Sequence, residues 1–179
     1  MTLHITLQSG EKEDFSLKFK IDADDSFGDL HRLILQSCNY EERQGQRFFV
    51  CDENWKPRTR ILLSDEENVD IDEDVLLMDD TDLGEFLEDE GQHLAYRFDP
   101  ENRRMFLLEL TETTFGDDVK KRGELTQCEG CPPEQFVSED ETITNTQTEV
   151  SEELGEEFYG EDGFDEEDLD EEGFDILDE

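Results

Sequence analysis

The chain has 179 residues, of which 54 are acidic and 15 basic, so its formal net charge is −39. Such a field repels phosphate backbones and anionic membrane surfaces, and we therefore expect neither direct nucleic-acid binding nor membrane association. No apolar run is long enough to span a bilayer, and the first residues alternate in polarity, unlike a secretory signal. Together these features predict a cytoplasmic protein.

Alternating apolar and polar residues predict two strands, over residues 2–8 and 15–22, that form a β-hairpin. A helix is predicted next, over residues 24–40. Its apolar stripe comprises Phe27, Leu30, Leu33, Ile34 and Cys38. Ser26 with Asp29 three residues later has the pattern of a capping box. Because a helix with one apolar stripe must cover another surface, we expect it to pack on the sheet.

The middle of the chain predicts further strands and one more helix. Residues 46–52 form the third expected strand, and residues 60–63 a short edge strand after the break at Pro57. A short helix is expected between Asp80 and Gly91. Residues 93–99 and 103–112 alternate and form a second hairpin. The order β-β-α-β-(β)-α-β-β predicts an α+β fold, with a mainly antiparallel sheet of five or six strands covered by one long and one short helix.

Apolar periodicity ends after Phe115, and the charge distribution changes there as well. Residues 1–115 hold 29 acids and 12 bases, whereas residues 116–179 hold 25 acids and 3 bases. We predict a globular α+β domain (1–115), an irregular cysteine-containing extension (116–137) and a disordered acidic tail (138–179). The acidic tail contains no Lys, Arg or His, and it has too little apolar surface to offset the entropy of ordering.

Four landmarks, in order, resemble the plasmid pRiA4b ORF-3-like family. They are Ser26–His31, Leu83–Leu87, the hairpin Tyr96–Glu109 and the Cys-Pro-Pro-Glu step at 131–134. The resemblance covers residues 1 to 136, with the acidic tail as an addition. It implies an α+β domain that is associated with mobile elements in some members and has no established activity. The hairpin departs from the family pattern, which has Asp-Phe-Gly-Asp followed by Trp and His at this place.

The cysteines allow a metal or redox site but do not favour one. Cys128 and Cys131 have the spacing of a redox pair or of half a zinc site. Two prolines follow directly, which does not suit a redox helix. A structural zinc would need two more ligands, and Cys38 and Cys51 lie in predicted core elements. We expect reduced thiols and no cofactor.

The end of the chain also matches part of a calcium-binding loop. Acids stand at positions 1, 3, 5 and 12 of such a loop, at Asp168, Asp170, Glu172 and Glu179. Asp175 occupies the position that is usually apolar, and no exiting helix follows. The expected behaviour is weak, non-specific binding of divalent ions.

No residue set identifies a reaction. An enzyme would have its site between the predicted long helix and the last hairpin, around His31, Tyr96 and Asp99. His4 and His93 lie on predicted strands, and no Ser or Cys partner follows from the spacing of any of the three histidines. The simpler interpretation is that these histidines are structural or solvated.

Acids alternate with apolar and aromatic residues in the acidic tail. Segments of this kind dock their apolar anchors in grooves of basic partners and fold on binding. The expected anchors are Phe158, Tyr159, Phe164, Leu169, Phe174, Ile176 and Leu177. The alternative is a tail that only confers solubility.

We therefore predict a non-catalytic interaction protein whose acidic tail engages a basic protein partner, or masks a basic surface in cis. The basic clusters visible in the sequence are Arg103 with Arg104, and residues 120–122. The second hypothesis is an enzyme or accessory factor of a mobile-element family, and a third is a divalent-ion binder that uses the tail. The sequence does not predict the oligomeric state.

Overall fold

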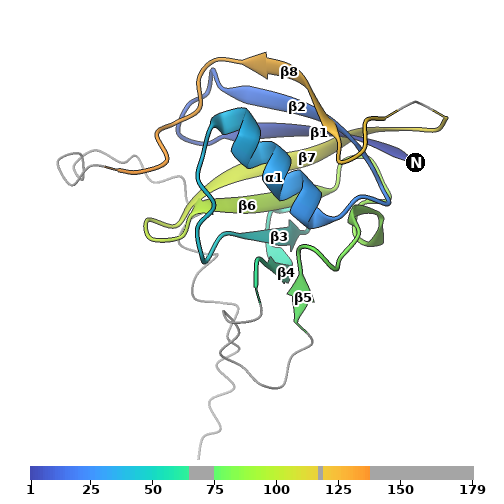
Figure 1. Ribbon diagram of the computed structural model, residues 1–179, viewed down its shortest axis with the longest axis horizontal. Coiled ribbons are helices and arrows are strands. Elements are labelled where there is room, and N and C mark those ends of the chain that lie inside the picture. Colours follow the sequence, from blue (N-terminus) through green and yellow to red (C-terminus); the bar gives the residue numbers. More distant parts are fainter. Residues whose placement is uncertain (65–74, 117–118, 138–179) are drawn as a thin grey trace, which may run out of the picture.

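A computed structural model describes residues 1–64, 75–116 and 119–137. In this part of the chain, eight strands form one sheet, and one α-helix, α1 (Phe27–Cys38), packs on one of its faces (Figure 1). The strands are β1 (Thr2–Ser9), β2 (Ser16–Asp22), β3 (Arg47–Cys51), β4 (Pro57–Leu62), β5 (Leu76–Leu77), β6 (His93–Asp99), β7 (Arg104–Thr114) and β8 (Glu124–Glu129). Their spatial order is β5-β4-β3-β6-β7-β1-β2-β8. All neighbours are antiparallel except β4 and β5.

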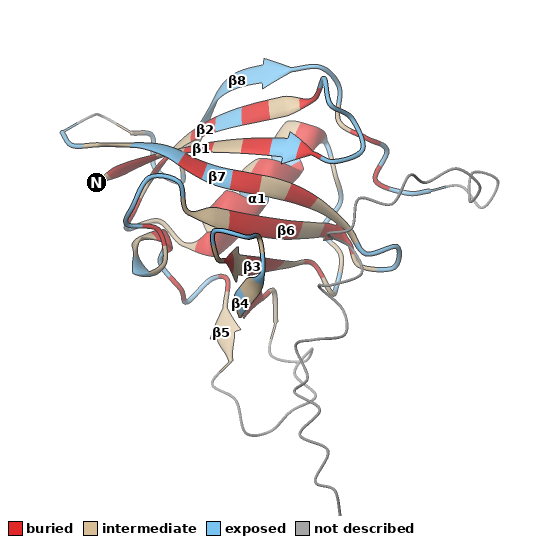
Figure 2. Ribbon diagram, turned by 180° about the vertical axis from the view of Figure 1, so that it is seen from behind, coloured by how far each residue is buried: buried red, intermediate tan, exposed pale blue. Residues whose placement is uncertain are grey.

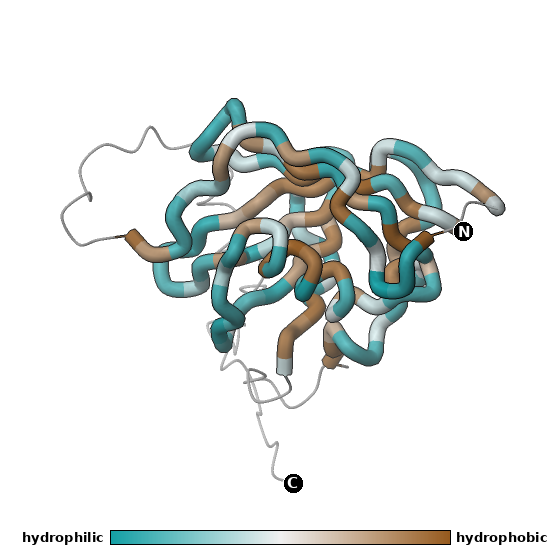
Figure 3. The backbone as a smooth tube through the Cα atoms, turned by 45° about the horizontal axis from the view of Figure 1, so that its top comes forward, coloured by the Kyte–Doolittle hydropathy of each residue, from teal (hydrophilic) through white to brown (hydrophobic). Residues whose placement is uncertain are grey.

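The opening hairpin forms as its alternation predicts. Leu3 pairs with Ile21, Ile5 with Phe19 and Leu7 with Leu17, and all six side chains are buried. The residues between them point to the opposite face, so hydrophobic and hydrophilic positions alternate along the strands (Figure 3). The buried set makes one core between the sheet and α1.

The helix α1 has the predicted capping box. The backbone N–H of Asp29 donates to Oγ of Ser26 at 3.2 Å, and the N–H of Ser26 donates to the Asp29 carboxylate at 3.4 Å. The helix ends at Asn39, which has the left-handed φ of 55° that often terminates helices. Phe27, Leu30 and Ile34 are fully buried against the sheet, whereas Leu33 lies at the margin of the core.

The expected second helix is wrong. Only a 3-10 turn, η2 (Leu83–Glu85), forms in that segment. The N–H of Leu83 donates to the carbonyl of Asp25 at 2.9 Å, and that of Gly84 to the carbonyl of Ala23 at 2.8 Å. These long-range bonds dock the turn on the β2–α1 connection, where a Cβ added at Gly84 would lie only 3.1 Å from the Cβ and the carbonyl oxygen of Ala23. The segment is thus fixed by tertiary contacts that its helical spacing does not reveal.

The predicted fold class, an α+β fold of five or six strands with two helices, is wrong: the described part of the chain is mostly sheet, with eight strands and one α-helix. The sheet has eight strands instead of five or six, because the expected edge strand forms as β4, β5 adds a short parallel pair, and β8 lies where we expected irregular structure. A proline is tolerated at the first residue of a strand, so Pro57 starts β4 and does not delay it. The side chains of β8 are mostly exposed, and the strand therefore lacks the alternation that marked β1 and β2.

In the residues that the structure describes, no helix is long and apolar enough to cross a membrane.

Candidate functional site on the open face of the sheet

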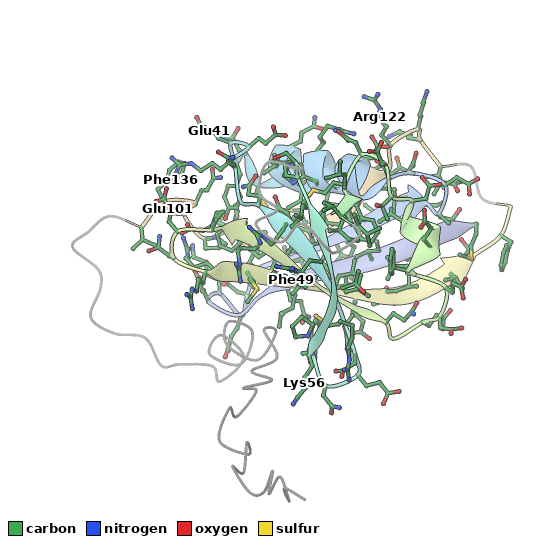
Figure 4. The ribbon with its side chains drawn as sticks, turned by 90° about the horizontal axis from the view of Figure 1, so that it is seen from below. Glu41, Phe49, Lys56, Glu101, Arg122 and Phe136 are labelled. Carbon is green, nitrogen blue, oxygen red and sulfur yellow. The ribbon has the colours of Figure 1, made fainter. Side chains whose placement is uncertain are left out.

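The sheet has one face that α1 does not cover, which we call the open face. Successive side chains of a strand point to opposite faces, so Phe48 and Tyr96 face α1 whereas Phe49 and Arg97 face the other way. Figure 4 shows Phe49 on the side of the sheet away from α1, and Figure 2 shows strands β6 and β7 in front of the helix. In register, Phe49 stands beside Ala95, and Arg47 beside Arg97.

A small apolar cluster lies on the open face, separate from the main core. Its members come from three adjacent strands and are Phe49, Cys51, Ala95, Met105 and Leu107. The first three are buried and the last two are half-buried. The open face thus presents a hydrophobic centre on β3, β6 and β7.

Three arginines stand near Phe49, at one end of this apolar cluster. The guanidinium of Arg97 lies over the ring of Phe49, with its Cζ atom 5.0 Å from the ring centroid. Arg60 of β4 is the register partner of Phe49, and Arg47 is the register partner of Arg97. We call Arg47, Arg60 and Arg97, together with Phe49, the arginine face. These arginines come from β3, β4 and β6, so the arginine face exists only once the sheet has formed.

The arginine face brings together three cationic side chains in a chain that is strongly acidic as a whole. Burial, together with the nearby charges of Arg47 and Arg103, lowers the pKa of Arg97 to about 10. Nε of Arg97 is buried and has no hydrogen-bond partner among the described residues. A buried N–H of a cation without an acceptor costs free energy, so this group favours an anionic ligand.

This arrangement suits one chemical class of ligand. The planar guanidinium group binds carboxylates bidentately. Its contact with an aromatic ring adds a cation–π attraction. The adjoining apolar cluster offers contacts to hydrophobic side chains. An acidic peptide segment with interspersed apolar residues supplies both kinds of group.

Of the three predicted catalytic candidates, His31 of α1 and Tyr96 of β6 meet in the core between α1 and the sheet, away from the open face. The hydroxyl of Tyr96 lies 2.8 Å from Nδ1 of His31, and both side chains are fully buried. Nε2 of His31 lies 3.4 Å from the carboxylate of Glu42, which can only accept, so Nε2 carries the proton and Tyr96 donates to Nδ1. Burial lowers the pKa of His31 and raises that of Tyr96.

Asp99, the third candidate, does not join this pair. Its carboxylate accepts from the N–H and the side-chain amide of Asn102, at 3.3 and 2.8 Å, and thereby closes the β6–β7 turn. It also lies 3.5 Å from Arg104. The Asp99 carboxylate therefore already has hydrogen-bond partners in the turn and an ion pair with Arg104.

Arg104 fixes a segment that carries the Cys-Pro-Pro-Glu landmark, residues 131–136, which we call the strap. Its guanidinium donates to both carboxylate oxygens of Glu11, at 2.7 and 2.6 Å, and to the carbonyls of Glu134 and Gln135, at 2.8 and 3.2 Å. Gln135 also exchanges two hydrogen bonds with the backbone of Glu41, at 2.8 and 2.7 Å. The strap is thus held between the end of α1 and the β6–β7 hairpin.

The strap ends next to that hairpin. The guanidinium of Arg43 lies 4.2 Å from the ring centroid of Phe136 and 3.2 Å from the carboxylate of Glu101. Figure 4 shows Phe136, Glu101 and Glu41 at the same end of the molecule. The acidic tail therefore begins at the hairpin whose first strand, β6, carries Arg97.

All four cysteines are free thiols: Cys38 and Cys51 are buried, and Cys128 and Cys131 are exposed. Across the described ranges, no group of three or more His, Cys, Asp and Glu side chains is placed to hold a metal ion. The predicted tail anchors (Phe158, Tyr159, Phe164, Leu169, Phe174, Ile176 and Leu177) and the candidate ion ligands Asp168, Asp170, Glu172 and Glu179 lie outside the described residues.

The sequence did not point to the arginine face. The basic clusters it showed were contiguous, whereas Arg47, Arg60 and Arg97 are far apart in the chain. The available signal was one arginine in each of three predicted strands, at 46–52, 60–63 and 93–99, and only the strand order brings these arginines together in a patch.

Comparisons with known proteins give a family and a fold. A model of the plasmid pRiA4b ORF-3-like proteins matches residues 1–173 and so extends beyond residue 136, to which the sequence landmarks reach. A crystal structure of a protein of unknown function from Methanosarcina mazei Go1 is similar at a TM-score of 0.54 and 12% sequence identity, covering 71% of this chain and 68% of that one. At this identity the likeness shows the fold alone. No curated protein matches the chain.

Proposed function

The chain belongs to the plasmid pRiA4b ORF-3-like family, and we propose that this member is a non-catalytic, cytoplasmic interaction protein. Its acidic tail engages a basic surface, on a protein partner or on its own domain. The acidic residues around the anchors set the association rate by long-range attraction. The aromatic and aliphatic anchors supply contact area. The domain acts as the folded support from which the tail extends.

The observation that carries the proposal is chemical complementarity within one molecule. The acidic tail offers carboxylates and apolar side chains and has no cation of its own. The arginine face offers guanidinium groups around an apolar cluster, including a buried N–H without an acceptor in the described part of the chain. This pairing is the kind of recognition that the composition of the tail predicts.

The geometry favours this function over the enzyme hypothesis. A catalytic acid or base must reach the substrate, whereas His31 and Tyr96 are both 0% exposed and satisfy one another. Asp99 is committed to the β6–β7 turn and to Arg104. The lone exposed member of the His31 arrangement is Glu42, and a single surface carboxylate does not define a reaction.

Affinity capture followed by chemical cross-linking tests the proposal, with the full chain and a chain that ends at Val137 as baits. A partner held by the tail is captured by the full chain and lost with the shorter one, and its yield falls between low and physiological salt. A matched bait replaces Phe158, Tyr159, Phe164 and Phe174 with Ser at unchanged charge. If all three baits capture the same proteins, the tail has no recruiting role and the proposal fails.

A further inference from the structure

We propose that the arginine face is the docking site of the chain's own acidic tail, which covers it with the anchor-bearing segment between Phe158 and Leu177. This inference rests on the proposed function and specifies the surface that the tail engages in the free protein. Docking in cis makes the protein self-masking: a basic partner that captures the tail uncovers the arginine face. The ligand class is an acidic peptide segment with aromatic and aliphatic anchors.

The contacts at the arginine face support this assignment. Arg97 lies on the Phe49 ring and has its Nε–H buried without an acceptor in the described residues, so an incoming carboxylate would satisfy a group that is already desolvated. Arg60 is the register partner of Phe49 and Arg47 that of Arg97, so both cations belong to the same face of the sheet as Phe49. A carboxylate bound here meets several positive charges at once, which a single surface ion pair does not offer.

Charge complementarity selects the tail over other occupants. A second copy of the domain would bring mostly further acids, since residues 1–115 hold 29 acids and 12 bases. Nucleic acid would suit the arginines alone, but the surrounding field of a chain with a net charge of −39 opposes it. The tail is always present at high effective concentration because it is covalently attached.

The geometry of the attachment is compatible with docking in cis. The strap places Phe136 beside the β6–β7 hairpin, and Arg97 lies on β6 only a few residues from the turn. About 20 residues separate the strap from the first anchors, and an extended chain of that length reaches about 60 Å. The four strands β4, β3, β6 and β7 span only about 15 Å of sheet width, at about 4.8 Å per strand.

Paramagnetic relaxation in the full chain tests the inference. Cys128→Ser and Cys131→Ser remove the exposed thiols, and a nitroxide is attached at Gly160→Cys in the tail. Burial raises the pKa values of Cys38 and Cys51 to about 12 and about 11, which keeps these thiols unreactive toward the label. At low salt we expect loss of amide signal along β3, β4 and β6, and intact signals in β2 and β8.

Matched variants locate the contact. Arg60→Glu and, separately, Arg97→Gln should restore the lost signals, as should high salt. Lys18→Glu makes the same charge change as Arg60→Glu on β2, four strands from β3 in the sheet, and should leave the attenuation in place. Signal loss centred on residues 120–122, or equal responses to Lys18→Glu and Arg60→Glu, would overturn the assignment.

A mixed sample separates docking in cis from contact between copies. Isotope-labelled protein without nitroxide is combined with unlabelled protein that carries it, and attenuation in this mixture would contradict self-masking. The experiments distinguish a failure of this inference from a failure of the proposed function. If the signals are not attenuated but a partner is still captured through the tail, only this inference fails. Attenuation without any captured partner leaves the inference intact and removes the role of the tail in recruiting other proteins.

Discussion

The hydroxyl of Tyr96 donates to Nδ1 of His31 across 2.8 Å, in a site where both side chains are fully buried. The pair joins the central strand β6 to the middle of α1, and the two rings lie edge to face with centroids 5.6 Å apart. It therefore ties the helix to the sheet by a directional contact within an otherwise apolar core.

Replacing Tyr96 with Phe should destabilise the protein by about 1–3 kcal/mol, because it leaves Nδ1 of His31 buried without a donor. Urea unfolding measures the change in the free energy of unfolding. Tyr40→Phe is the control with a similar loss of one hydroxyl, since that group is less buried and bonds the strap carbonyl of Pro133. Equal destabilisation by the two variants would argue against a special role for the buried pair.

His31 should make stability fall as the pH drops below its ordinary pKa of 6.5. Burial lowers the pKa of His31 in the folded state, so between that lowered value and 6.5 the unfolded chain binds more protons. Stability is complete above this window and decreases toward acid. Melting temperatures from about pH 7.5 to about pH 5.5 should fall less steeply in His31→Gln than in the wild type.

The matched variant for this pH series is His4→Gln, which removes a histidine on β1 outside the buried pair. It should keep the slope of the wild type. A His31→Gln protein that loses melting temperature as steeply as the wild type would show that other groups cause the pH dependence.

Arg104→Ala should release the strap and lower stability by about 1.5–3 kcal/mol, the range for hydrogen bonds to charged groups. The change removes the bidentate pair with Glu11 and the bonds to the carbonyls of Glu134 and Gln135. Limited proteolysis should then cut within residues 131–136 faster than in the wild type. Arg104→Lys keeps the charge but loses the fork geometry, and we expect an intermediate rate. An unchanged cleavage pattern in Arg104→Ala would contradict the clamp.

The thiols should react in two classes. Cys128 and Cys131 are exposed, whereas burial raises the pKa values of Cys38 and Cys51 to about 12 and about 11. Reaction with a disulfide reagent at about pH 8 should therefore titrate two thiols quickly and the other two only after addition of denaturant. Four thiols of equal reactivity in the native protein would contradict the burial of Cys38 on α1 and of Cys51 on β3.

The sequence predicts those parts of the fold in which the spacing of apolar residues, or a local capping pattern, directly reflects which side chains are buried and where an element begins. Leu3, Ile5 and Leu7 alternate because one face of β1 is buried, and Ser26 with Asp29 marks the start of α1 through local bonds. The segment after Asp82 has helical spacing, yet it forms a 3-10 turn because its N–H groups bond to Ala23 and Asp25, far away in the chain. A local sequence pattern does not indicate such long-range hydrogen bonds.

Strand β8 and the arginine face escaped prediction for a related reason. The exposed side chains of β8 carry no apolar alternation, and its pairing with β2 is a backbone interaction that many sequences permit. Of the predicted catalytic candidates, the cleft hypothesis brought His31 and Tyr96 together, because both lie on core-facing positions. It misplaced Asp99, because residues three apart on a strand point to opposite faces, and the Asp99 carboxylate bonds to Asn102 in the turn and pairs with Arg104.

The Nε–H resonance of Arg97 tests most directly whether the acidic tail engages a basic surface. It should be compared by NMR in the full chain and in a chain that ends at Val137, with the dispersion of the core amides as the check on folding. We predict that in the full chain at low salt this resonance is shifted and protected from solvent exchange, and that removing the tail or raising the salt abolishes both effects. An identical Arg97 signal in the two chains at low salt would contradict the account.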